Sequence, residues 1–168
     1  MPDLETPRLR LHALTVEEGS ALHADGRVDG FDYAEGYPLP DTHDGVGLFV
    51  KHGVVDYGFH LIVRRDDGRV IGEIGFVGPP HRGSVTIGYA VVPAARRQGY
   101  ATEAVAALTA WAIAQPEVDE VKAQTLPDNE PSIRALLRVG FVEEPPLPKV
   151  RRFAYRGDSA TSSPPSAS

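Results

Sequence analysis

The chain has 168 residues, of which 42% are hydrophobic and 24% charged, a composition that indicates one globular domain with a sizeable core. A formal net charge of −6 argues against sequence-independent binding to nucleic acid, and no apolar run is long enough to cross a membrane. There is no cysteine, no metal-ligand spacing among the six histidines and no signal-peptide pattern at the start, which together predict a cytoplasmic protein without a disulfide framework or a bound metal.

The first third of the chain predicts a strand, a helix and a long irregular segment. Residues 9–12 alternate between apolar and polar side chains, as in a half-buried strand. Thr15 is a suitable cap for a helix over residues 16–24, which has acidic residues in its first turn. Residues 25–56 have little regular period, apart from a short helix expected around residues 44–52, and loops of this length are commonly functional or flexible.

The rest of the chain alternates between predicted strands and helices. A hairpin with its turn at residues 66–68 joins strands over residues 57–63 and 69–77, and further strands are expected over residues 85–92, 119–125, 141–143 and 150–155. Helices are predicted over residues 102–114 and from Asn129 onward, and Pro145, Pro146 and Pro148 predict a stiff loop. This order indicates an α/β fold with a mixed sheet and helices on both faces, formed by residues 1–156, and a disordered Ser/Pro-rich tail over residues 157–168.

A phosphate site is indicated where the strand at residues 85–92 gives way to the next helix. Pro93 ends the strand, and Arg96-Arg97-Gln98-Gly99 forms a compact loop directly before the helix. Backbone N–H groups at a helix start and the helix dipole favour an anion, Gly99 permits close approach of the backbone, and the two arginines can add charged hydrogen bonds. Two common phosphate loops do not fit, since the chain has no G-x-x-x-x-G-K-[ST] and no G-x-G-x-x-G.

Three segments of the chain resemble one enzyme superfamily. The spacing R-x-x-G-x-A at Arg96, Gly99 and Ala101 resembles the pyrophosphate motif of GNAT-type N-acetyltransferases, and the segment from Asn129 to Gly140-Phe141 resembles a second motif of that family. The opening TPRLRLHALTVEE is similar to the start of the ribosomal-protein N-terminal (Rim-type) acetyltransferase branch. The resemblance covers roughly residues 4–155 and implies a single-domain GNAT-like fold whose mixed sheet is splayed beside the cofactor.

The resemblance also implies the ligands and the residues that hold them. The cofactor is expected to be acetyl-coenzyme A, whose pantetheine arm pairs with backbone groups that a splayed strand leaves free. The residues expected to bind it are Val91, Val92, Arg96, Arg97, Gln98, Gly99, Tyr100, Ala101, Thr102 and Asn129. The long segment shapes the acceptor pocket in this family, so the expected contacts of an acceptor amine are Phe31, Asp32, Tyr33, Glu35 and Tyr37.

Transfer of an acetyl group to an amine requires a base that accepts the amine proton. Glu73 is the only acid inside the central predicted strands, where apolar neighbours shift a carboxyl pKa, and it is the expected base. Asp32 and Glu35 are the alternatives if the long segment folds over the site.

The acyl oxygen and the leaving thiolate need partners as well. An N–H donor for the acyl oxygen is expected at Val91 or Val92. Many family members place a tyrosine seven residues after the asparagine to assist the thiolate, but this chain has Leu136 there. Ser132 resembles the general acid of the ribosomal-protein branch and is the expected acid, with Tyr100 as the second choice.

Three functions remain open from the sequence. The first is an acetyl-coenzyme A-dependent N-acetyltransferase that acts on a protein N-terminal amine by direct attack. The second is the same reaction on a small amine, such as an antibiotic, a polyamine or an amino acid derivative, and the third is a non-catalytic acyl-coenzyme A-binding regulatory module. Neither nucleic acid nor a membrane is expected as a partner, and either a monomer or a homodimer is compatible with the chain.

Overall fold

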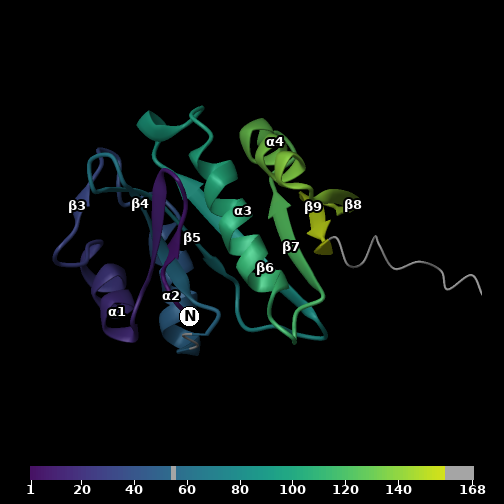
Figure 1. Ribbon diagram of the computed structural model, residues 1–168, viewed down its shortest axis with the longest axis horizontal. Coiled ribbons are helices and arrows are strands. Elements are labelled where there is room, and N and C mark those ends of the chain that lie inside the picture. Colours follow the sequence, from purple (N-terminus) through teal and green to yellow (C-terminus); the bar gives the residue numbers. More distant parts are fainter. Residues whose placement is uncertain (54–55, 158–168) are drawn as a thin grey trace, which may run out of the picture.

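A single mixed sheet organises the part of the chain that the computed structural model describes, residues 1–53 and 56–157 (Figure 1). Within these residues the strands are β1 (Leu4–Glu5), β2 (Leu9–Ala13), β3 (Asp32–Tyr33), β4 (Phe59–Arg64), β5 (Arg69–Phe76), β6 (Ser84–Val91), β7 (Glu120–Thr125), β8 (Val142–Leu147) and β9 (Val150–Tyr155). The helices are α1 (Val16–Asp25), α2 (Thr42–His52), α3 (Tyr100–Ile113) and α4 (Glu130–Val139), with a 3-10 turn η1 (Pro93–Ala95). The sheet order is β1-β2-β4-β5-β6-β7-β9-β8, and β3 pairs with β5.

Helix boundaries follow from local capping chemistry. Thr15 and Glu18 form a reciprocal capping box at the start of α1, and Gly26 ends the helix in the left-handed conformation. The Asn129 side chain accepts a hydrogen bond from the Ser132 N–H at the start of α4, and Gly140 ends that helix with a φ of 112°. The predicted α/β architecture and the helix after Thr15 are therefore confirmed.

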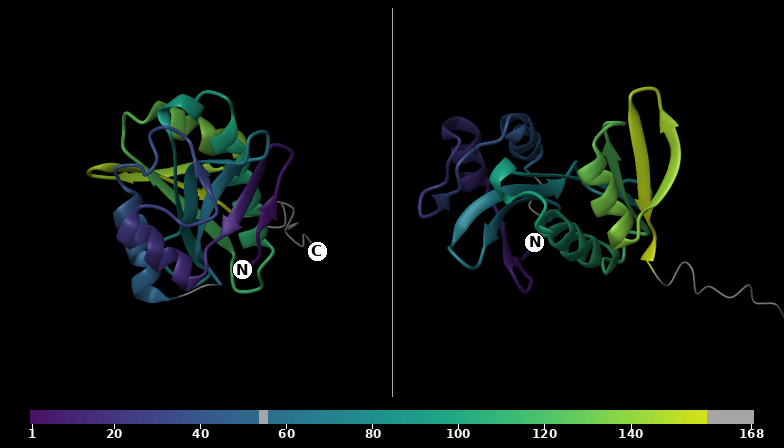
Figure 2. Two further views of the ribbon diagram at one scale, coloured as in Figure 1. Left: turned by 90° about the vertical axis from the view of Figure 1, so that its left-hand side faces the viewer. Right: turned by 90° about the horizontal axis from the view of Figure 1, so that it is seen from above.

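The four helices cover opposite faces of the sheet (Figure 2). Helices α1 and α2 pack on each other and on one face, called here the α2 face, where Gly45 of α2 lies against Phe59 of β4. Helices α3 and α4 pack on each other and on the opposite face, called here the α3 face. None of the described helices is long and apolar enough to cross a membrane.

The structure adds and corrects several elements. The predicted strand at residues 9–12 is preceded by β1, which pairs with it antiparallel. The described part of the segment over residues 25–56 is more ordered than expected, because β3 pairs with the start of β5 and α2 begins at Thr42. Helix α3 begins at Tyr100 rather than at residue 102, since Gly99 is its cap.

The proline loop was the clearest error of the sequence analysis. Pro145 and Pro146 lie inside β8, which pairs only with β9 and has a register shift between Glu144 and Leu147. A proline has no N–H to donate, and an edge strand with an irregular register does not require one. The tail predicted to be disordered lies, except for Gly157, outside the described residues.

Candidate active site

The sheet opens between β6 and β7. These strands pair in parallel from Ser84 with Glu120 to Ile87 with Ala123, and the pairing stops there although both strands continue. Gly88 is exposed despite its position in a central strand, and a Cβ built on it meets nothing within 4 Å. Four residues of β6 therefore border a gap that the main chain leaves unfilled.

Backbone direction decides which groups face this gap. The Val92 N–H donates to the Ile71 carbonyl at 2.8 Å, so it is used in pairing with β5. Because N–H and C=O groups alternate between the two sides of a strand, those of Tyr89 and Val91 point toward β7. Of the two expected donors to the acyl oxygen, Val91 has the suitable direction and Val92 does not.

The loop after β6 presents a run of free N–H groups. Within the described residues, the N–H groups of residues 97–102 donate to no protein acceptor, and the first helical bond into the loop runs from the Glu103 N–H to the Gly99 carbonyl at 3.0 Å. Arg97 and Gly99 have φ angles of 63° and 80°, the left-handed conformation that turns successive N–H groups to one side. This backbone geometry suits an anion, so the loop remains the predicted pyrophosphate site.

The side chains of this loop have more specific placements than the sequence indicated. Arg96 Nε donates to the Val91 carbonyl at 2.9 Å, and Gln98 Nε2 donates to the Ala94 carbonyl at 3.3 Å. The Tyr100 ring lies 4.4 Å from the Arg8 guanidinium carbon, on the β2 side of the loop. Arg96 and Gln98 therefore brace the loop, whereas Arg97 is exposed. Ala101 and Thr102 lie in the first turn of α3.

Glu73 occupies a buried polar cluster on the α2 face. Its side chain is opposite Ala90 of β6, and the residue is 4% exposed. Glu73 Oε2 accepts hydrogen bonds from Tyr37 Oη and Thr42 Oγ1, both at 2.8 Å. Burial raises the pKa of the Glu73 carboxyl, which the hydrogen bonds from Tyr37 and Thr42 only partly offset. A carboxylate of raised basicity thus lies beside the strand that borders the gap.

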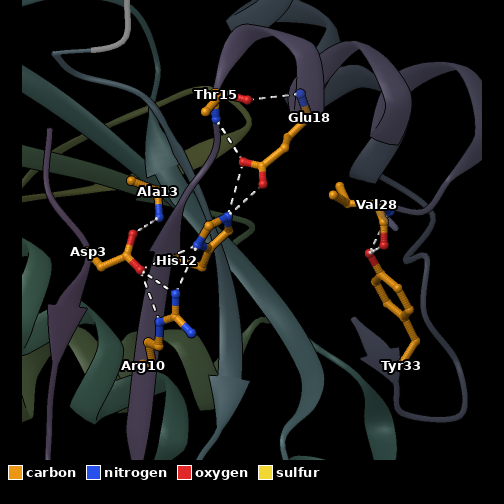
Figure 3. Close-up of polar contacts among 8 residues, drawn as sticks. All are labelled: Asp3, Arg10, His12, Ala13, Thr15, Glu18, Val28 and Tyr33. Atoms are coloured by element: carbon orange, nitrogen blue, oxygen red, sulfur yellow. Dashed lines mark hydrogen bonds and ion pairs between the residues drawn. The ribbon is translucent and has the colours of Figure 1, made fainter. Parts of the chain in front are cut away.

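The residues expected to contact an acceptor amine divide into two groups. The Tyr33 hydroxyl accepts from the Val28 N–H at 2.7 Å and is engaged with its own loop (Figure 3). The Phe31 ring packs 4.9 Å from the His12 ring. Asp32 and Glu35 are exposed. The neighbouring Gly36 backbone approaches Val92 and Pro93, so this loop passes next to the end of β6.

The start of α1, beside this loop, is fixed by a network of polar contacts (Figure 3). His12 Nε2 lies 3.0 Å from Glu18 Oε2, and His12 Nδ1 lies 3.3 Å from Asp3 Oδ2. Asp3 also pairs with Arg10 at 2.8 Å. The network joins Asp3, directly before β1, to β2 and to the first turn of α1.

Ser132 lies on the α3 face at the start of α4. Its backbone carbonyl accepts a hydrogen bond from Tyr89 Oη at 3.2 Å, while its own hydroxyl has no hydrogen-bond partner among the described residues. The Asn129 side chain binds the Ser132 N–H at 3.4 Å and acts as the helix cap. Leu136 is fully buried in the core. Ser132 and Glu73 therefore lie on opposite faces of the sheet.

Sequence reasoning missed Thr42, Gly88 and Tyr89 as members of the candidate site, and it expected Tyr37 as an acceptor contact rather than as a partner of Glu73. Tyr89 shares one face of its strand with Ile87 and Val91. The sequence pattern alone therefore does not distinguish it from an aromatic residue of the core. The one available signal was Glu73 itself, because a carboxylate inside an apolar strand requires hydroxyl or N–H partners from elsewhere in the chain.

Comparisons with known proteins agree with this arrangement. The family model "Acetyltransferase (GNAT) domain" matches residues 8–142. An uncharacterized N-acetyltransferase of Bacillus subtilis, YjdG, is 30% identical over 152 residues, which cover 83% of this chain and 89% of YjdG.

Two solved structures share the fold. One is RimL, a ribosomal L7/L12 alpha-N-protein acetyltransferase in complex with coenzyme A, with a TM-score of 0.70, 18% identity and coverage of 94% of this chain and 99% of RimL. The other is the microcin C7 self-immunity acetyltransferase MccE in complex with acetyl-CoA and AMP, with a TM-score of 0.67, 14% identity and coverage of 90% and 94%. With the family model matching most of its length, the chain belongs to the GNAT acetyltransferases.

Proposed function

We propose that this protein transfers the acetyl group of acetyl-coenzyme A to a protein N-terminal amine by direct attack of the amine. The observation that carries the proposal is the run of free N–H groups over residues 97–102 directly beside the opening between β6 and β7. A pyrophosphate fits such a run, and an extended arm with amide groups fits the backbone of Tyr89 and the Val91 N–H, which face the opening without a strand partner. RimL and MccE, which share the fold, were solved with coenzyme A and acetyl-CoA respectively.

The two faces of the sheet then have different tasks. Acetyl-coenzyme A supplies the acetyl group as a thioester, which enters from the α3 face, where α4 and the loop lie. The amine approaches from the α2 face, where Gly88 leaves open space and Glu73 accepts the proton released as the N–C bond forms. The Val91 N–H donates to the acyl oxygen as its charge develops. Ser132 gives a proton to sulfur as the C–S bond breaks.

An open α2 face supports a peptide acceptor. A peptide must extend away from the reacting amine, and the exposure of Gly88, together with the exposed Glu35 and Asp32, leaves room for it and offers carboxylates to a cationic chain end. The fold itself does not select the acceptor.

The test is release of the coenzyme A thiol in the presence of a panel of acceptors. We expect turnover with peptides that have a free N-terminal amine and none with the same peptides after N-terminal blocking. Gly99→Val is the control for the cofactor loop, because its φ of 80° disfavours any side chain. Turnover confined to small amines would overturn the peptide assignment, and an unchanged coenzyme A affinity in Gly99→Val would overturn the cofactor site.

A further inference from the structure

The TPRLRL segment at the start of the chain meets the proposed cofactor loop some ninety residues later in the sequence. Arg8 Nη1 donates to the Gln98 carbonyl at 2.8 Å, and the guanidinium stacks on the Tyr100 ring. Arg8 Nε donates to Glu103 Oε1 at 2.8 Å, and the Arg8 N–H donates to Glu103 Oε2 at 2.9 Å. One arginine therefore contacts the loop, the helix cap region and the first turn of α3.

These contacts bear on the direction of one peptide group. In a trans peptide the C=O and the following N–H point in opposite directions. Because the Gln98 carbonyl points at Arg8, the Gly99 N–H points away from Arg8, into the run of free donors over residues 97–102. Without a partner for that carbonyl, the peptide between Gln98 and Gly99 loses the hydrogen bond that favours this direction.

The backbone of Arg8 is fixed before the side chain reaches the loop. The Arg8 carbonyl accepts from the Arg65 N–H at 2.9 Å, and Arg65 Nη1 donates to the Thr6 carbonyl at 2.8 Å. Thr6 Oγ1 also donates to Glu103. The end of β4 and the first turn of α3 thus hold the segment from both sides.

The negative charge of Glu103 gives Arg8 a second role beside the anion site. A carboxylate in the first turn of α3 lies close to the region where the anion binds, and it repels a phosphate unless its charge is compensated. Arg8 forms an ion pair with this carboxylate through Nε and donates a second hydrogen bond to it from its backbone N–H, and the Glu103 side chain is 18% exposed. The same contact that orients the loop also neutralises the nearest acid.

We infer that Arg8 is a positioning residue of the pyrophosphate site, which orients the Gln98–Gly99 peptide and compensates Glu103 without contacting the reacting atoms. The inference rests on the proposed cofactor. It gives the N-terminal segment a role in cofactor affinity that no pattern in residues 4–9 indicates by itself.

The experiment compares two substrates that differ only beyond the pantetheine arm. Acetyl-coenzyme A carries the pyrophosphate, and S-acetylpantetheine does not. We expect Arg8→Met to raise KM for acetyl-coenzyme A by about tenfold or more, the usual effect of losing a charged hydrogen bond, with kcat little changed. The kcat/KM for S-acetylpantetheine should stay within about twofold, because that substrate has no group for the loop.

Arg10→Met is the matched control. Arg10 lies two residues further on, its side chain is 45% exposed like that of Arg8, and it pairs with Asp3 rather than with the loop. It should leave both substrates unaffected. Arg8→Lys keeps the charge but lacks the planar fork that reaches Gln98 and Glu103 together, so it should retain a smaller but clear rise in KM.

Each result bears on one of the two claims. If the unaltered protein binds coenzyme A and Arg8→Met binds it equally well, or loses equal activity with both substrates, the positioning role is overturned while the cofactor stands. If the unaltered protein fails to bind coenzyme A in calorimetry, the proposed function and this inference are both overturned. Melting temperatures of all three variants check that a loss does not come from unfolding.

Discussion

Glu73, the proposed base, is buried at a cost in stability. Its carboxyl group is buried beneath α2 and satisfied on one oxygen by Tyr37 and Thr42. Burial raises its pKa, so the folded protein favours the protonated form more than the unfolded chain does. The stabilisation linked to this group is complete below the unfolded pKa and is lost as the pH rises through the folded pKa.

Glu73→Gln should therefore change activity and stability in opposite directions. We expect kcat to fall by about 10²–10⁴-fold near neutral pH, the usual worth of general base catalysis, with a smaller defect at higher pH where more amine is already neutral. The same variant should be more stable relative to the unaltered protein at neutral pH than at pH 4, since glutamine has no charge to bury. Rate profiles and denaturant melts across pH measure both effects, and a defect of equal size at every pH would assign Glu73 a structural role.

Ser132 and Tyr89 are the two hydroxyl groups on the other face of the gap. If Ser132 protonates the leaving thiolate, Ser132→Ala should lower kcat by about 10²–10⁴-fold and leave coenzyme A affinity unchanged, because the interaction forms only in the transition state. Tyr89→Phe removes the bond to the Ser132 carbonyl and should have a smaller effect on kcat. Steady-state kinetics and calorimetry separate the two outcomes, and a fully active Ser132→Ala beside an inactive Tyr89→Phe would transfer the acid role to Tyr89.

The sequence predicted individual site residues only where a motif or an anomaly marked them. Gly99 and the arginines belong to a motif, and Glu73 is an acid in an apolar run, so both were expected before the structure was seen. Tyr37 and Thr42 lie in a segment whose sequence has no regular period. They are 36 and 31 residues from Glu73 in the sequence, and only the fold brings them into contact with it. Arg96 was expected to bind phosphate, but its bond to the Val91 carbonyl depends on how the loop turns back.

At the scale of elements, β6 serves two different purposes along its length. Its first half, Ser84 to Ile87, pairs with β7, whereas its second half, Ile87 to Val91, pairs with β5, and only Ile87 has a strand partner on both sides. The residues opposite each other on the α2 face are Glu73 with Ala90 and Gly75 with Gly88. The lack of a side chain at Gly88 keeps this part of the face open.

Gly88→Val tests whether that space receives the acceptor. A built Cβ meets no atom within 4 Å, and a β-branched residue suits a strand, so the melting temperature should be unchanged or slightly higher. We expect kcat/KM for the acceptor to fall by about tenfold or more, while the KM for acetyl-coenzyme A, which enters from the α3 face, stays constant. Thr86→Val, two residues earlier on the same face in the paired part of β6, is the control, and an acceptor kcat/KM unaffected by Gly88→Val would place the amine elsewhere.

Elements with strong local signals were predicted well, and those set by tertiary pairing were not. The capping box at Thr15 and the caps at Asn129 and Gly140 fixed α1 and α4 to within a residue or two, because the signals are local. By contrast, β3 has two residues and exists because they pair with the start of β5. The strand through Pro145 and Pro146 contradicts local propensity, and its position at the sheet edge resolves the contradiction.

For the whole molecule, the opening divides the sheet into two unequal parts. Strands β1 to β6 form one part and β7 to β9 the other, and four residue pairs between β6 and β7 join them. Helices α3 and α4 pack across this junction on one face. A ligand that fills the gap should therefore contact both parts at once.

Acetyl-coenzyme A should stabilise the entire fold. At a concentration of 100 times Kd the linkage is worth about 2.7 kcal/mol, which for a chain of this size corresponds to a rise in Tm of about 5–10 °C. Amide hydrogen exchange should slow in Tyr89, Val91 and the start of α4, and less in β1 and β2. Adenosine 3′,5′-bisphosphate, which lacks the pantetheine arm, should protect the strand amides far less, and equal protection by both ligands would argue against an arm lying in the gap.

The two edge strands of the sheet determine whether copies of the molecule can associate by strand pairing in a crowded solution. An edge strand offers a row of unpaired donors and acceptors that can recruit further chains into an aggregate. At one edge β1 has only two residues, and at the other the outward row of β8 is interrupted by Pro145, Pro146 and a change of register. A foreign strand finds no long, regular ladder at either end, so the prolines that complicate the sequence also protect the protein against growth by strand addition.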